Sequence, residues 1–200
     1  MRDIWQRLPT RGKTFCLAAL AAAIAAPLVA DRYLLSVLIL VFYFAYLGQA
    51  WNLLMGFAGQ LSLGHALYLG LGAYTATALW TLFGIGPWIG VFIAIPVAAA
   101  AGMIVGWLGW RFAIEGVYFA LLTIAFAEFT RIGFDHLQIT GASAGLFLSV
   151  NSPGSDKWWN LGGGPLLYYY LALILAAAAT LLVAWLRRSP LGYRWLAVRE

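Results

Sequence analysis

Residues 33–55 read YLLSVLILVFYFAYLGQAWNLLM, and this stretch decides the fold. It runs for 23 residues without an Asp, Glu, Lys, Arg or His. A helix rises about 1.5 Å per residue, so a helix of this length would measure about 34 Å. Because the hydrocarbon layer of a membrane is about 30 Å thick, the stretch predicts a helix that spans a membrane with a slight tilt.

The composition of the whole chain agrees with this prediction. Of its 200 residues, 64% are hydrophobic and only 10% are charged, whereas a soluble domain carries roughly 25% charged residues. The surface of a water-soluble protein cannot be built from so few charges. We therefore predict an all-α, polytopic transmembrane protein.

Further apolar runs of about spanning length follow one another along the chain. Together they make about six predicted spans: 14–30, 33–55, 61–83, 87–110, 117–134 and 166–186. The first run follows basic residues, so a cleaved signal peptide is an alternative to a retained helix. A signal peptide carries a small residue three positions before its cleavage site. At the end of this run that position holds Leu28, which favours the retained helix.

Basic side chains indicate how the predicted spans are oriented, because cytoplasmic loops accumulate Lys and Arg. When the spans are threaded alternately, nine basic residues fall on one side and two on the other. The nine are Arg2, Arg7, Arg11, Lys13, Arg111, Arg187, Arg188, Arg194 and Arg199; the two are Arg32 and Lys157. We therefore predict a cytoplasmic N-terminus, and we interpret the formal charge of +5 as a topology signal rather than a nucleic-acid surface.

Two short motifs resemble catalytic ones but are incomplete. Residues 12–14, GKT, match the end of a Walker A loop, which requires a glycine five positions earlier that is absent. Residues 141–145, GASAG, match GxSxG, but a nucleophilic serine needs a base within hydrogen-bond reach. His136, in the expected external loop, is an unpromising base for Ser143, and Cys16 is the only cysteine. We therefore predict no catalytic residue and no metal site.

Two opposite charges lie inside the fifth predicted span. Each alone would cost roughly 2.5–3.5 kcal/mol at mid-membrane. Glu128 and Arg131 are three residues apart, so they share one face of a helix and can neutralise each other. One interpretation is a gate or a contact for a transported molecule. The interpretation that we favour is a structural pair that reaches toward the outer membrane surface.

The segment between the second and third predicted spans combines glycines with uncharged polar side chains. It reads NLLMGFAGQLSLGH over residues 52–65. Transporters use broken helices of this kind, because freed backbone groups at membrane depth can line a permeation path and bind polar ligand groups. A short cytoplasmic turn, followed by close helix packing through Gly64, Gly70 and Gly72, is an equal alternative. On the first interpretation, the path residues are Asn52, Gln60, Ser62, Gly64, His65, Glu128 and Arg131.

Three segments resemble, in order, the signature of the branched-chain amino acid ABC transporter permeases, particularly those of the LivM type. They are residues 52–76, which begin NLLMGFAGQLSLGH and end GAYTA, residues 116–131, GVYFALLTIAFAEFTR, and residues 140–146, TGASAGL. In that family the third segment commonly reads TGGxxG and is an external turn, so Ser143 is not expected to be a nucleophile. Ala142 stands here at the second glycine.

The C-terminal residues 188–200, RSPLGYRWLAVRE, are similar to the family's cytoplasmic stretch that docks on the ATPase. The resemblance implies that residues 187–200 are a cytoplasmic coupling segment. Its candidate coupling residues are Gly192, Arg194, Arg199 and Glu200. Without the resemblance, a basic segment of this kind would be interpreted as a structural anchor at the membrane edge.

The resemblance also implies an architecture and a set of partners. The expected fold is that of ABC importer permeases related to vitamin B12 and ribose permeases, in the bacterial inner membrane. Residues 1–200 would be one transmembrane permease domain, and an incomplete one, because family permeases carry further spans after the coupling segment. The implied partners are a second permease subunit of the LivH type, two cytoplasmic ATPase subunits, a periplasmic substrate-binding protein and membrane lipid, with no nucleic acid. The ATPases would use the ATP, so no cofactor is expected in this chain.

The implied function is the import of branched-chain amino acids, and three alternatives differ from it. A permease of the same architecture could transport urea or short amides. An ATP-independent secondary transporter or channel would work without the ATPases. An intramembrane protease would require Ser143 as its nucleophile.

Overall fold

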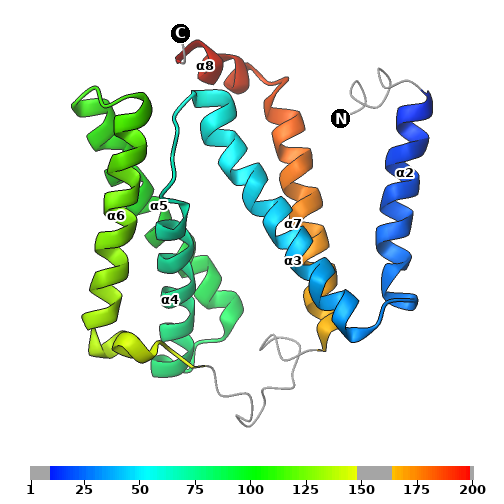
Figure 1. Cartoon of the computed structure of the whole chain (residues 1–200), viewed down its shortest axis with the longest axis horizontal. Helices are drawn as coiled ribbons and strands as arrows, with labels where there is room; N and C mark the ends of the chain where they lie inside the picture. Colours follow the sequence, from blue (N-terminus) through cyan, green and yellow to red (C-terminus); the bar gives the residue numbers. More distant parts are fainter. Residues whose placement is uncertain (1–9, 148–163, 199–200) are drawn as a thin grey trace. The chain divides into compact units, whose positions relative to one another are not determined.

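The computed structural model describes residues 10–147 and 164–198, and within them every regular element is helical (Figure 1). The longer helices are α2 (Thr10–Ala25), α3 (Arg32–Asn52), α4 (His65–Phe83), α5 (Pro87–Arg111), α6 (Gly116–His136), α7 (Pro165–Leu186) and α8 (Pro190–Val198). Short helical turns follow α2, α3 and α6: η1 (Ala26–Leu28), η2 (Leu53–Phe57), η3 (Gln138–Thr140) and η4 (Ala142–Ala144). The predicted all-α fold is confirmed.

Five of the six predicted spans are helices long and apolar enough to cross a membrane. In the described part of the chain they cover Arg32–Phe57, His65–Phe83, Pro87–Arg111, Gly116–His136 and Pro165–Leu186. The first predicted span, 14–30, is instead the 16-residue helix α2 followed by the turn η1. A transmembrane helix needs roughly 17–25 residues, so α2 alone is too short by this measure, and its crossing stays a prediction.

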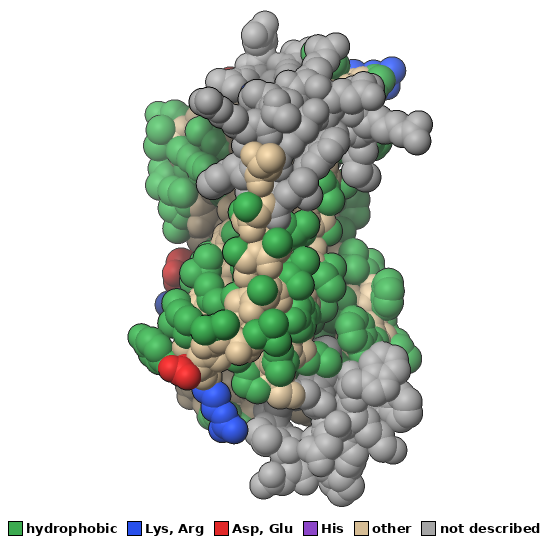
Figure 2. Space-filling model, turned by 90° about the vertical axis from the view of Figure 1, so that its right-hand side faces the viewer, with side chains coloured by type: hydrophobic (Ala, Val, Ile, Leu, Met, Phe, Trp, Pro, Cys, Tyr) green, Lys and Arg blue, Asp and Glu red, His purple; other side chains and the backbone are tan. Residues whose placement is uncertain are grey.

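The side chains on the outside of these helices are those of a protein surrounded by lipid. Figure 2 shows hydrophobic side chains over most of the described surface on the face that it presents. Large residues such as Phe92 and Phe129 are more than two thirds exposed. Soluble proteins rarely expose apolar patches beyond a few hundred Å², so this surface fits a membrane.

The described chain divides into two compact units. The first contains α2, α3, α7 and α8. Helices α3 and α7 run side by side in the same direction, and α2 begins at the end of this unit where α7 ends (Figure 1). Tyr169 of α7 is fully buried there, packs edge-on against Phe42 at a centroid distance of 5.5 Å, and donates a hydrogen bond to the Ala23 carbonyl oxygen at 2.5 Å. This bond ties α2 to α7.

The second unit contains α4, α5 and α6. Its core is built from Leu67, Val105 and Phe119, one residue from each helix. Small residues allow the helices to approach. A methyl group at Gly90 would lie 3.3 Å from the Ala76 carbonyl oxygen, and one at Gly109 would lie 2.7 Å from the Phe119 ring.

A tight turn closes the end of α6 at residues 137–145. Thr140 Oγ1 donates to the carbonyl oxygens of Phe134 and Leu137, at 3.0 and 2.8 Å. Gly141 and Ala142 both adopt left-handed backbone conformations, with φ of 78° and 49°. A glycine tolerates this region at no steric cost, whereas a side chain such as that of Ala142 is strained there.

Candidate functional site

Helix α3 ends in a π-helical turn followed by a glycine. The turn is η2, and Gly59 has a φ of 67°, in the left-handed region. Gln60 then donates its backbone N–H to the Leu54 carbonyl oxygen at 3.3 Å. This is the usual way in which a glycine just beyond the last turn satisfies carbonyl groups at a helix end. Residues 59–64 that follow are not helical, and we call them the break segment.

The break segment packs directly on α6. The backbone N–H of Leu63 donates a hydrogen bond to Thr123 Oγ1 at 3.1 Å. Ser62 is fully buried beside it. A methyl group at Gly64 would overlap the Thr123 carbonyl oxygen and would lie 2.6 Å from its carbonyl carbon. Only a glycine therefore allows the chain to approach α6 this closely.

This contact fixes the depth of the break segment relative to α6. Thr123 is the eighth of the 21 residues of α6, which places it about 10 Å from the helix start and well inside a helix about 31 Å long. Accordingly, α4 begins at His65, four residues later than the predicted span. Irregular backbone at membrane depth is tolerated only where protein or a cavity surrounds it, and here protein does. The geometry favours the broken helix over the short surface turn.

Two side chains of this region carry buried polar atoms, Gln60 and His65. Gln60 Oε1 has no hydrogen-bond partner among the described residues, whereas the His65 ring interacts with the Ser62 backbone. The His65 ring meets the Tyr68 ring edge-on at a centroid distance of 6.0 Å. A buried polar atom that makes no hydrogen bond costs about 1–3 kcal/mol, so Gln60 Oε1 has capacity to bind a polar group that enters.

The predicted path residues do not all fall together. Gln60, Ser62, Gly64 and His65 lie in or next to the break segment, in the second unit. Asn52 is the exposed last residue of α3 and belongs to the first unit. Three glycines were considered for close packing. A methyl group at Gly64 would meet the α6 backbone, whereas one at Gly70 or Gly72 would have no neighbouring atom within 4 Å.

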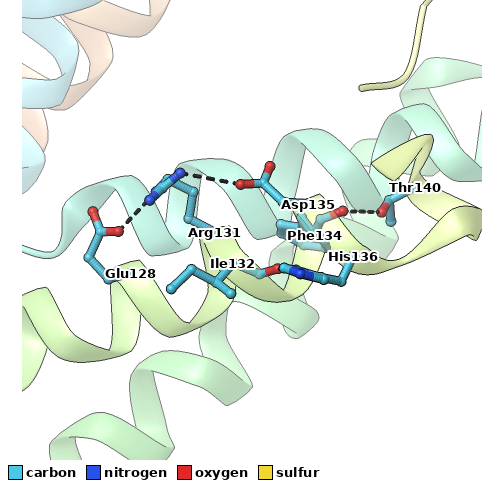
Figure 3. A network of polar contacts seen from close by, with 7 residues as sticks. All are labelled: Glu128, Arg131, Ile132, Phe134, Asp135, His136 and Thr140. Atoms are coloured by element: carbon cyan, nitrogen blue, oxygen red, sulfur yellow. Dashed lines mark hydrogen bonds and ion pairs between the residues drawn. The ribbon is translucent and has the colours of Figure 1, made fainter. Parts of the chain in front are cut away.

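Glu128 and Arg131 are part of a three-residue charge network on α6 (Figure 3). Arg131 Nε lies 2.9 Å from Glu128 Oε2, and Arg131 Nη1 lies 3.2 Å from Asp135 Oδ2. The side chains of Arg131, Glu128 and Asp135 are 63%, 55% and 43% exposed. The predicted pair is therefore present, and Asp135 was missed although its spacing of four residues from Arg131 could have revealed it.

The charge network and the break segment use different faces of α6. Glu128 follows Thr123 by five residues, which turns the helix by about 140°. The ion pairs of Arg131 with Glu128 and Asp135 lie within α6 itself. The network and the break segment are two separate features.

The predicted coupling segment contains a capped helix. Ser189 Oγ donates to the Leu186 carbonyl oxygen at 2.9 Å and accepts the backbone N–H of Gly192 at 3.1 Å, which starts α8. A methyl group at Gly192 would overlap that same carbonyl oxygen. Arg194 is exposed. Arg199 and Glu200, like Arg2, Arg7 and Lys157, lie outside the described residues.

The GASAG motif lies in the turn after α6, where Ser143 belongs to η4. His136 Nδ1 lies 2.8 Å from the Ile132 carbonyl oxygen, within its own helix. In the described part of the chain, no hydrogen bond joins Ser143 to either histidine.

Several long apolar helices, with a glycine-rich break that packs on α6, are those of a polytopic membrane protein. Residues 33–200 match the family model described as "Branched-chain amino acid transport system / permease component". The chain therefore belongs to the family of branched-chain amino acid transport system permeases. As expected from the resemblance, it is a multi-pass protein of the inner membrane.

Two curated relatives carry the same printed name, "High-affinity branched-chain amino acid transport system permease protein LivM". The relative from Escherichia coli (strain K12) is 34% identical over 135 residues, which cover 67% of this chain and 31% of the relative. The relative from Salmonella typhimurium (strain LT2) is 30% identical over 209 aligned positions, which cover 94% of this chain and 49% of the relative. The chain thus spans about a third to a half of the length of these relatives. No solved structure matches it.

Proposed function

We propose that this chain is the transmembrane permease subunit, or part of it, of an ABC importer for branched-chain amino acids. The proposal rests on the family membership and on the printed names of the relatives. The observation that carries it structurally is the break segment, which brings polar groups to membrane depth beside α6.

In this proposal the break segment borders the permeation path. Gln60 and His65 offer buried polar atoms, and Ser62 lies between them in the chain. A transported amino acid carries an ammonium and a carboxylate group, which need hydrogen-bond partners when they leave water. Gly64 would set the approach to α6 rather than bind, and Asn52, in the first unit, stays a separate predicted path residue.

The charge network has a structural role in this proposal. Exposed charges facing lipid at mid-membrane would cost roughly 2.5–3.5 kcal/mol each. Arg131 lies five residues before the end of α6, about 7.5 Å along the helix, so its side chain can reach toward the external surface. A direct contact of Glu128 and Arg131 with the transported molecule is the alternative.

The proposed partners are a second permease of the LivH type, two cytoplasmic ATPase subunits that use ATP, and a periplasmic binding protein. Gly192 and Arg194 of α8, together with Arg199 and Glu200, would contact the ATPases. ATP binding would close the ATPase pair and move α8, switching the spans between outward and inward states. In the first unit, the start of α2 and the end of α7 lie at the same end (Figure 1), which supports the proposed cytoplasmic N-terminus. We propose no catalytic step for this chain.

The test is an uptake profile in proteoliposomes that contain this chain, the second permease, the ATPases and the binding protein. We expect leucine, isoleucine and valine to accumulate only when ATP is present. Accumulation of urea or acetamide instead would favour the short-amide permease. Uptake that persists when the ATPases are omitted would favour an ATP-independent transporter and would refute the proposal.

A further inference from the structure

We propose that Thr123 is a positioning residue for transport: it anchors the break segment to α6 without touching the transported molecule. Its contacts with Leu63 and Gly64 are called the Thr123 anchor. That the anchored segment borders a permeation path rests on the proposed function, whereas the anchor itself does not.

The Thr123 hydroxyl makes two hydrogen bonds with opposite roles. Its side chain is buried, with only 1% of the residue exposed. Oγ1 donates to the Ala120 carbonyl oxygen of its own helix at 2.8 Å and accepts the backbone N–H of Leu63 at 3.1 Å. Because the hydroxyl proton is used on α6, an oxygen lone pair is directed at the break segment.

The Leu63 amide depends on this acceptor. Leu63 lies outside any helix, so no carbonyl group four residues earlier receives its proton. Buried backbone N–H groups are almost always hydrogen-bonded, and an unpaired one inside a membrane is costly. The side chain of a residue 60 positions away therefore satisfies the group that the broken helix leaves unpaired.

The anchor also determines where the path residues lie. Leu63 stands between Ser62 and Gly64, and His65 begins α4 directly afterwards. Gly64 packs against the Thr123 backbone carbonyl. Thr123 therefore contacts two successive residues of the segment, Leu63 through its hydroxyl and Gly64 through its carbonyl. Release of the hydroxyl contact would shift Ser62 and His65 relative to α6 while leaving the helices themselves hydrogen-bonded.

The test combines hydrogen exchange with transport in three variants. Thr123→Val removes the hydroxyl but keeps the shape, and Thr123→Ser keeps the hydroxyl. Thr81→Val is the matched control, because the Thr81 hydroxyl bonds only to carbonyl oxygens of its own helix. Amide exchange at Leu63 is measured by mass spectrometry on the purified chain in nanodiscs, and leucine uptake is measured in the full assembly.

We expect Thr123→Val to speed exchange at Leu63 by about tenfold or more, with the amides of α4, α5 and α6 unchanged. Leucine uptake should fall at least as strongly in that variant, and Thr123→Ser and Thr81→Val should match the original chain in both measurements.

Three results would overturn the inference: unchanged exchange at Leu63 in Thr123→Val, equally faster exchange along all three helices, or normal uptake despite a released Leu63. If the original assembly takes up no branched-chain amino acid, the proposed function fails, while the exchange measurement still decides whether the anchor exists.

Discussion

Replacing Gly64 by alanine tests the packing of the break segment on α6. The added methyl group would lie 2.6 Å from the Thr123 carbonyl carbon, whereas ordinary contacts begin at 3.4 Å. The methyl group would also overlap the Thr123 carbonyl oxygen, so the segment or α6 must move by more than about 0.8 Å, and the obstacle is helix backbone that cannot rotate away. Overpacking of this kind costs about 1–3 kcal/mol. For a chain of this size, each kcal/mol lowers the unfolding midpoint by about 2–4 °C, so we expect a decrease of about 2–12 °C.

The assay is thermal unfolding of the purified chain, followed by size-exclusion fluorescence, with Gly72→Ala as the matched control. Gly72 has no atom within 4 Å of the position of a new methyl group, and alanine is favoured over glycine inside a helix by about 1 kcal/mol. The control should therefore unfold at the same or a slightly higher temperature. An equal midpoint for Gly64→Ala and Gly72→Ala would refute the close approach of the break segment to α6.

Three further predictions test other parts of the structure. Ala142→Gly relieves a left-handed backbone conformation and should raise the unfolding midpoint by about 2–4 °C, corresponding to about 1 kcal/mol; no gain would show that the turn is not strained. Tyr169→Phe removes the bond to Ala23 and should lower the midpoint by about 1–6 °C, whereas Tyr43→Phe, at an exposed side chain, should have no effect. Arg194→Glu should uncouple uptake from ATP hydrolysis with unchanged expression, and normal uptake would argue against a coupling role for α8.

The long helices could be predicted from the sequence because a membrane imposes a length of uninterrupted apolar chain. Residues 87–110 were expected to span and form α5, Pro87–Arg111. The first run differs because α2 ends at Ala25 and η1 follows, with Pro27 in its first turn. Apolar composition predicts that a segment enters the membrane more reliably than where its helix ends.

The residues of the candidate site could be predicted from the sequence, but the depth of the break segment could not. The glycines and polar side chains of residues 52–65 left a broken helix and a short surface turn as equal alternatives. The depth of the segment depends on Thr123, which reads as an ordinary threonine in an apolar run. Nothing local connects two residues 60 positions apart. Gly70 and Gly72 looked equivalent to Gly64 in the sequence, and only the fold shows that Gly64 alone of the three meets a backbone.

The depth of the break segment in the bilayer can be measured with spin labels. A nitroxide spin label at Leu63→Cys, in a chain with Cys16→Ser, would be compared with labels at Ile124→Cys and Val117→Cys on α6, all three at side chains that the structure leaves exposed. The relative access of oxygen and of a water-soluble nickel complex reports the depth of each label in the bilayer. We expect the label at position 63 to lie as deep as the one at 124, about a third of the way along α6. If the label at 63 is as accessible to the nickel complex as the label at 117, or more accessible, the segment lies in a surface turn and the break at membrane depth is refuted.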